Sequence, residues 1–172
     1  INNLVNILCV ADLYCNKNHK NLLKAVDSIN KDKIICTLTL VAREQGDCKY
    51  DILEKIKNID YVYLKKSLNR TELINEYRKA DIFCMCSFHE TFGLVYLEAL
   101  SQQVPIIYTK NEGVDGLIPA NYGNRSSTDS FSIEKSIIDL INKIKQSKSI
   151  LIDEEFIKSF QWNKIAVEYE SL

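Results

Sequence analysis

The chain has 172 residues and a net charge of −1, which suits one domain with its own hydrophobic core. The near-neutral charge argues against a broad nucleic-acid surface, which is usually strongly basic. No apolar run approaches the roughly 20 residues of a membrane span. The first ten residues lack the basic start of a signal peptide, and the chain begins with Ile. We therefore expect a part of a longer protein.

Short apolar runs rich in β-branched residues alternate along the chain with segments whose apolar residues recur at helical spacing. The third helical segment can be capped by Asn69 or can hold Thr71 in its first turn. The polar stretch 123–130 is expected to be a loop. The predicted strands are residues 4–10, 33–41, 61–64, 81–86 and 105–108. The predicted helices are residues 21–29, 50–59, 71–78, 92–101, 131–145, 153–159 and 162–171.

This alternation predicts an α/β fold, a Rossmann-like parallel sheet of about five or six strands flanked by helices. In such a sheet, ligands bind in the crevice at the carboxyl ends of the strands. Functional residues are therefore expected in the loops that follow the strands, which are residues 11–19, 42–50, 65–70, 87–91 and 109–124.

Six cysteines are present, and none forms a C-x-x-C pair. Three of them lie inside apolar strand-like runs, which favours buried free thiols in a reducing compartment. Cys84 and Cys86 would share one face of a strand, but two thiols do not close a zinc site. We expect no metal. The remaining cysteines are Cys9, Cys15, Cys36 and Cys48.

The most informative segment is the loop after residues 81–86 together with the helix behind it. Glu90 lies in the loop and Glu98 in the helix, which is apolar nearly all round and is expected to be buried. A buried carboxylate needs hydrogen-bond partners, and ribose or sugar hydroxyls would supply them. Gly93 would let a phosphate approach the backbone N–H groups at the helix start. Alternatively, Glu98 reaches solvent and Glu90 is a helix-start charge favoured by the dipole.

The segment from Arg78 to Leu100 resembles the C-terminal nucleotide-sugar-binding domain of retaining GT-B glycosyltransferases of group 1 (family 4). The hallmark of that family is two glutamates separated by seven residues in an E-x-F-G-L…E-A context, and Glu90 and Glu98 match it. Lys17-Asn18, with the segment 22–25 behind it, resembles the family's K-[GN]-x-x-x-L-[IL]-x-A motif. Further similar segments are 61–64, 105–107 and 160–162 with Tyr169. The resemblance covers nearly the whole chain.

The resemblance implies roles for individual residues. Glu90 would bond hydroxyls of the donor sugar, and Lys17 would pair with the diphosphate and stabilise charge on the leaving group; these are the expected catalytic residues. Glu98 would hold the ribose. No metal or other cofactor is implied. The other donor-binding residues, with backbone amides toward the sugar and the distal phosphate, would be Thr91, Phe92, Gly93 and Leu94.

The sequence departs from the family pattern near the expected diphosphate. Many members carry an Arg five residues before the Lys, and here Asp12 stands in that place, as an acid does in some members reading G-E-L-N-x-N-K-N-H. We expect Asp12 to turn away, and either to orient Lys17 or to accept N–H groups of residues 13–18. Lys20 could supply part of the missing charge.

Two further departures concern the backbone. Gln103 replaces the usual Gly after the helix. The backbone there is expected to be left-handed, and a residue other than Gly in that conformation costs on the order of 1 kcal/mol. The usual G-G loop reads Asn111-Glu112-Gly113-Val114-Asp115-Gly116, so donor contacts are in doubt there.

These features predict one half of a two-domain enzyme: residues 1–172 would be the donor-binding domain, without the N-terminal acceptor domain. The expected reaction transfers a hexosyl unit with retention to a saccharide or lipid-linked acceptor, in surface polysaccharide synthesis. The donor would be a UDP- or GDP-linked sugar, the location cytoplasmic, and the isolated domain inactive. Peripheral membrane association is expected of the full-length protein only.

Three alternatives remain open. A sugar-nucleotide epimerase of GT-B fold is one, and a non-catalytic nucleotide-binding module, suggested by Asp12, is another. The third, a receiver-like signalling domain, is disfavoured because residues 61–65 offer no phosphoacceptor Asp.

Overall fold

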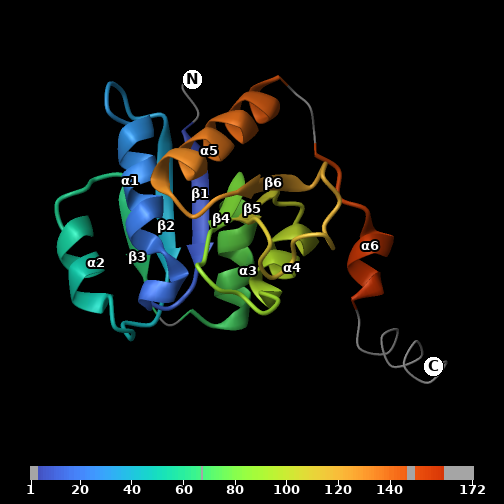
Figure 1. Ribbon diagram of the computed structural model, residues 1–172, viewed down its shortest axis with the longest axis horizontal. Coiled ribbons are helices and arrows are strands. Elements are labelled where there is room, and N and C mark those ends of the chain that lie inside the picture. The colour runs from blue at the N-terminus through green and yellow to red at the C-terminus, as the bar shows by residue number, and fades with distance from the viewer. Residues whose placement is uncertain (1–3, 67, 147–149, 161–172) are drawn as a thin grey trace.

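The computed structural model describes residues 4–66, 68–146 and 150–160, and it forms a parallel sheet flanked by helices (Figure 1). The strand order is β3-β2-β1-β4-β5-β6, and every pair of neighbours is parallel. This confirms the predicted fold class. The strands are β1 (Val5–Val10), β2 (Cys36–Val41), β3 (Val62–Lys65), β4 (Ile82–Met85), β5 (Ile106–Thr109) and β6 (Gly123–Ser126).

The helices cover both faces of the sheet. On one face α1 packs against α5; on the other α3 contacts α4, as right-handed crossovers require (Figure 1). Among the described residues, no helix is long and apolar enough to cross a membrane. The predicted helix 162–171 and Tyr169 lie outside the described residues. The helices are α1 (His19–Ile29), α2 (Lys49–Ile56), α3 (Arg70–Lys79), α4 (Leu94–Ser101), α5 (Ser130–Lys145) and α6 (Glu154–Ser159), with a short 3₁₀ turn, η1 (Cys15–Lys17).

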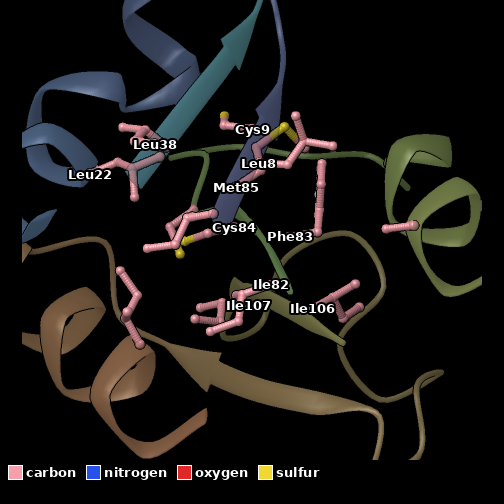
Figure 2. Close-up of a cluster of buried hydrophobic side chains, with 14 of the residues drawn as sticks. Leu8, Cys9, Leu22, Leu38, Ile82, Phe83, Cys84, Met85, Ile106 and Ile107 are labelled. Atoms are coloured by element: carbon pink, nitrogen blue, oxygen red, sulfur yellow. The ribbon is translucent and has the colours of Figure 1, made fainter. Parts of the chain in front are cut away.

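Strands β1 and β4 form the centre of the core. All four residues of β4 are buried, because a parallel sheet covered on both faces needs continuous apolar strands rather than alternating ones. Figure 2 shows Phe83, Cys84 and Met85 of β4 beside β1, together with side chains of β5 and of α1. The four free thiols in the described residues are all buried, as predicted: Cys9, Cys36, Cys84 and Cys86.

Strand β6 corrects the prediction that residues 123–130 are a loop. Its sequence, Gly-Asn-Arg-Ser, gives no apolar signal because β6 lies at the edge of the sheet. Gly123 pairs with Ile106 of β5, and a Cβ atom at Gly123 would lie 2.0 Å from the Ile106 carbonyl oxygen. The glycine therefore permits the close approach that adds this sixth strand.

Two local predictions about helix ends can be checked. Asn69 rather than Thr71 caps α3, and it forms a capping box with Glu72. Gln103 has a φ of 63°, the left-handed backbone expected after α4. Its amide exchanges two hydrogen bonds with the backbone of Ile152, which ties the end of α4 to the segment before α6.

The strand order reverses between β1 and β4. From β1 the chain proceeds to β2 and β3 on one side, and then crosses to β4, β5 and β6 on the other. In open α/β sheets, such a switch point leaves a crevice at the carboxyl ends of the two strands. The loops after β1 and β4 carry Lys17 and Glu90, so both residues belong to this crevice.

Candidate functional site

Lys17 and Glu90 meet at the switch point. The Lys17 Nζ atom lies 2.8 Å from Glu90 Oε2, and the two side chains are 25% and 11% exposed. Seventy-three residues separate them in sequence, so only the sheet order brings them together. The result is a partly buried ion pair in the crevice where the sequence placed both residues.

The loop after β5 holds Glu90 in place. Glu112 accepts a hydrogen bond from the Glu90 N–H at 2.9 Å, and the Gly113 N–H donates to the Glu90 carbonyl at 2.9 Å. Gly113 has a φ of +53°, and a Cβ atom there would lie 2.9 Å from Glu90 Cγ. The loop that replaces the G-G motif thus serves to fix the backbone of Glu90.

The start of α4 lies directly after this loop and presents free backbone N–H groups. Gly93, with a φ of +81°, is the N-cap; no side chain caps the helix, and its first turn holds no acid. Across the described residues, no acceptor meets the N–H groups of Phe92, Gly93 and Leu94. Thr91 is exposed, while the Phe92 ring packs on Phe160 at 6.0 Å. The open N–H groups and the positive end of the helix dipole favour an anion.

Glu98 is exposed, which corrects the expectation that it is buried. Leu94, Glu98 and Ser101 form an exposed stripe along α4 at helical spacing. Tyr77 of α3 donates a hydrogen bond to Glu98 Oε2 at 2.8 Å. Burial, with the nearby Glu98 carboxylate, raises the pKa of Tyr77, so the phenol stays a donor. Glu98 is therefore oriented from one side and open to solvent on the other.

Asp12 turns to the loop after β2. It accepts hydrogen bonds from the Arg43 backbone N–H, from the Arg43 guanidinium and from the Gln45 amide. Burial would raise the pKa of Asp12, but these hydrogen bonds together outweigh it and hold the pKa below 3.8. The expectation is wrong for the Asp12 carboxylate, which bonds neither to Lys17 nor to an N–H group of residues 13–18 among the described contacts, although the Asp12 backbone carbonyl does accept the Tyr14 N–H at 2.8 Å. The partners of the Asp12 carboxylate are instead Arg43 and Gln45, which lie more than 30 residues later in the chain.

Lys20 does not extend the positive charge of the crevice. It pairs instead with Asp51 on α2, and both side chains are exposed. The expectation that Lys20 supplies part of the missing charge is therefore wrong.

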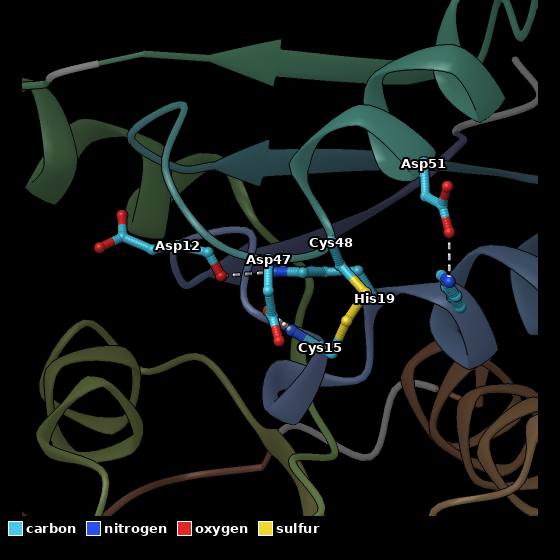
Figure 3. Close-up of a disulfide and its surroundings, with 7 residues drawn as sticks. Asp12, Cys15, His19, Asp47, Cys48 and Asp51 are labelled. Atoms are coloured by element: carbon cyan, nitrogen blue, oxygen red, sulfur yellow. Dashed lines mark hydrogen bonds and ion pairs between the residues drawn. A yellow bond between two sulfur atoms is a disulfide. The ribbon is translucent and has the colours of Figure 1, made fainter.

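A disulfide joins Cys15 of η1 to Cys48 just before α2 (Figure 3). The prediction of free thiols is wrong for this pair, because backbone hydrogen bonds of Leu13 with Gln45 and Cys48 bring the two loops together. Cysteine usage therefore no longer argues for a reducing compartment. Asp47 lies beside both sulfurs, but the sulfurs are bonded to each other, and the Asp47 carboxylate accepts the Cys15 N–H at 2.7 Å.

An open cleft of about 450 Å³ lies at the carboxyl ends of β1 and β2. Its lining is mostly apolar and ends at the Asp12–Arg43 pair, a residue combination that suits a flat ring with a polar edge. No local pattern in the sequence indicates this cleft, because its residues come from three separate segments. They are Val10, Ala11, Asp12, Val41, Ala42, Arg43 and Leu68.

The sequence matches the family described as glycosyl transferases group 1 over residues 3–159. The chain belongs to the group 1 glycosyltransferase family. Over 166 residues it is 28% identical to a probable sucrose-phosphate synthase from Thermosipho melanesiensis, covering 89% of this chain and 38% of that protein. Over 75 residues it is 36% identical to a sulfoquinovosyl transferase from Arabidopsis thaliana, covering 43% of this chain and 15% of that protein. The chain therefore spans well under half the length of these relatives.

Solved structures of GT-B glycosyltransferases share the fold. A sucrose-phosphate synthase from Thermosynechococcus elongatus superposes with a TM-score of 0.80 at 19% identity, over 99% of this chain and 45% of that one. The C-terminal domain of a group 1 glycosyltransferase from Francisella tularensis gives a TM-score of 0.75 at 20% identity, over 91% of this chain and 85% of that one. The described fold is thus the Rossmann-like fold of one half of a GT-B enzyme.

Proposed function

We propose that this chain is the donor-binding half of a retaining glycosyltransferase, which transfers a hexosyl unit from a nucleoside diphosphate sugar to a saccharide or lipid-linked acceptor. The observation that carries the proposal is the Lys17–Glu90 pair at the switch point, next to the open start of α4. An ammonium group, a carboxylate and free N–H groups in one crevice match the diphosphate and the hydroxyls of such a donor.

Donor binding exchanges the internal ion pair for contacts with the ligand. Lys17 pairs with the diphosphate and stabilises the negative charge that develops when the bond to the sugar breaks. Glu90, released from Lys17, accepts hydrogen bonds from the sugar. The N–H groups of Phe92, Gly93 and Leu94 meet the sugar and the distal phosphate, and Thr91 lies at the mouth of this site. These groups neutralise the diphosphate without a metal.

The nucleoside extends from the crevice along the neighbouring elements. Glu98, oriented by Tyr77, accepts hydrogen bonds from the ribose hydroxyls. The base fits the cleft of about 450 Å³ between the loops after β1, β2 and β3. UDP- and GDP-linked sugars are the probes that compare uracil with guanine in this cleft.

A non-catalytic nucleotide-binding module is the second candidate, because Asp12 stands where many members carry an Arg. The Arg43 and Gln45 contacts satisfy the Asp12 carboxylate, so its charge is directed away from Lys17. That geometry favours the transferase over the module. A sugar-nucleotide epimerase of GT-B fold is distinguished by its products, a free nucleoside diphosphate and an epimerised sugar.

The full-length protein carries out the transfer in this proposal. The acceptor and part of the catalytic cleft belong to an N-terminal domain, so the 172-residue chain binds the donor without turning it over. The proposed setting is surface polysaccharide synthesis, with peripheral membrane association of the full-length protein.

Calorimetric titration of the 172-residue chain tests the proposal, with UDP-glucose, UDP, GDP-mannose and GDP as ligands. Glu98→Ala should weaken binding of the nucleotide with or without its sugar, because the ribose is common to both. Glu90→Ala should mainly reduce the preference for the nucleotide sugar over the free nucleotide. Absence of binding by all four ligands, or unchanged binding in both variants, contradicts the proposal.

A further inference from the structure

We propose that Asn16 is the positioning residue that sets Glu90 against Lys17 and so determines how strongly the site prefers a nucleotide sugar over a free nucleotide. This inference rests on the proposed function and assigns a role to a residue that would not itself touch the donor. It starts from three hydrogen bonds that Asn16 makes with the loop after β4.

The contacts of Asn16 all fall on two adjacent residues, Phe88 and His89. The backbone carbonyl of Asn16 accepts a hydrogen bond from the Phe88 N–H at 2.8 Å. The Asn16 side chain then meets both backbone groups of the next residue: Oδ1 accepts the His89 N–H at 3.0 Å, and Nδ2 donates to the His89 carbonyl at 2.9 Å. Asn16 thus satisfies backbone N–H and C=O groups of this loop in the way that neighbouring β-strands satisfy each other.

The chemistry of this contact explains why the residue is an asparagine. One side chain must accept from an N–H and donate to a C=O at the same time, and a primary amide does both. A carboxylate of the same shape could only accept, and it would face the His89 carbonyl oxygen without a proton to offer.

The contact fixes the register of the two loops. Asn16 directly precedes Lys17, and His89 directly precedes Glu90. Pairing Asn16 with His89 therefore leaves Lys17 opposite Glu90, with Lys17 Nζ 2.8 Å from Glu90 Oε2. The loop after β5 holds Glu90 from its other side through Glu112 and Gly113. Because Glu112 and Gly113 belong to neither loop, they cannot set the separation between them. The Asn18 side chain also bridges the two loops, but its Nδ2 donates to the Cys86 carbonyl at 2.9 Å, four residues before Glu90. Asn16 bonds to His89, the residue directly before Glu90.

A double-variant cycle tests this role by calorimetry on the 172-residue chain. The measured quantity is the ratio of the dissociation constants for UDP and UDP-glucose, with GDP and GDP-mannose as a second pair. Asn16→Ala should reduce the preference for the nucleotide sugar about tenfold, and Glu90→Gln should reduce it by a similar factor. In the Glu90→Gln background, Asn16→Ala should reduce it no further, because the group that Asn16 positions is already changed.

Asn21→Ala is the matched control. Asn21 lies five residues along, and its amide also donates to a backbone carbonyl, that of Thr128 at 2.9 Å, on the loop after β6 rather than on the loop that carries Glu90. It should leave the preference unchanged. If Asn16→Ala lowers the melting temperature far more than Asn21→Ala, Asn16→Asp repeats the measurement with the acceptor retained, and the same loss of preference is expected.

Three outcomes separate the inference from the function on which it depends. An unchanged preference in Asn16→Ala, beside a reduced one in Glu90→Gln, overturns the role of Asn16 and leaves the donor site standing. Equal losses from Asn16→Ala with and without Glu90→Gln also overturn it, because Asn16 would then act independently of Glu90. An unchanged preference in Glu90→Gln overturns the proposed function of the site itself.

Discussion

The loop after β1 takes part in two ion pairs, Asp12 with Arg43 on the loop after β2 and Lys17 with Glu90 on the loop after β4. The two pairs differ in how many hydrogen bonds their carboxylates accept. Asp12 receives a backbone N–H, a guanidinium and an amide, all from residues 43 and 45. The Glu90 carboxylate receives only Lys17 among the described residues. A saturated carboxylate has little capacity left for a ligand, whereas one with a single partner can accept more donors. Asp12 is therefore structural, and Glu90 is available to a substrate.

The largest expected effect comes from removing the Cys15–Cys48 disulfide, which holds the loop that carries one residue of each ion pair. Cys15 lies between Asp12 and Lys17, and its disulfide to Cys48 spans 33 residues. Cross-linking over that distance restricts the unfolded chain and contributes about 3–4 kcal/mol in the chain-entropy description. We expect Cys15→Ser to lower the free energy of unfolding in urea by about that amount.

A reductant provides the matched control for the disulfide. It should destabilise the wild-type chain to the level of Cys15→Ser and leave the variant unchanged. Equal unfolding midpoints for the reduced and untreated wild-type chain would show that the disulfide does not hold this loop.

The next effect concerns Lys17. Lys17→Ala should weaken nucleoside diphosphate binding by more than tenfold, because it removes the ammonium group that pairs with Glu90 in the crevice. The loss should shrink at high salt, since screening already weakens the lost interaction in the wild-type chain. Titration with UDP and GDP at low and high ionic strength measures both. Lys20→Ala is the control, because Lys20 pairs with Asp51 on the exposed surface; an equal loss there would remove the special role of Lys17.

The fold could be predicted wherever the sequence carries a strong apolar pattern. Strands β4 and β5 are continuous buried runs, and β1 and β2 are buried at four and five of their six positions. The alternation of these strands with helices then predicts a parallel sheet. Strand β6 escaped prediction because an edge strand needs few apolar side chains. The exposure of Glu98 also escaped it, because Leu94, on the same exposed stripe of α4, gave the helix an apolar appearance all round.

The site could be predicted only in part, for a reason of distance. Strand-end loops pointed to Lys17 and Glu90, and the parallel topology brings such loops together. The residues that hold the Glu90 loop, Asn16 and Glu112, act through tertiary hydrogen bonds and leave no local pattern, and the same is true of Arg43, which holds Asp12. The disulfide had a weaker signal, since Cys15 and Cys48 lie in two predicted loops while Cys9 and Cys36 lie in strands.

The smallest expected effect tests the structural side of the comparison. Because Arg43 and Gln45 satisfy Asp12, its charge should oppose the diphosphate little, and Asp12→Ala should change the affinity for UDP or GDP by less than tenfold, about 1.4 kcal/mol. A large gain in affinity would mean that Asp12 faces the phosphates, and the non-catalytic module would then be the better description of this chain.

The pH dependence of Asp12→Ala gives an independent check on the same residue. The folded chain holds the pKa of Asp12 below 3.8, its value without these partners. A depressed pKa stabilises the fold fully above the unfolded value, and the contribution is lost as the pH falls through the folded one. The wild-type chain should therefore be more stable than Asp12→Ala in urea at about pH 6, and the difference should close as the pH falls below about 3.8. A difference that is constant across this range would mean that the Asp12 charge contributes nothing to the fold, and the Arg43 and Gln45 contacts could not then account for its orientation.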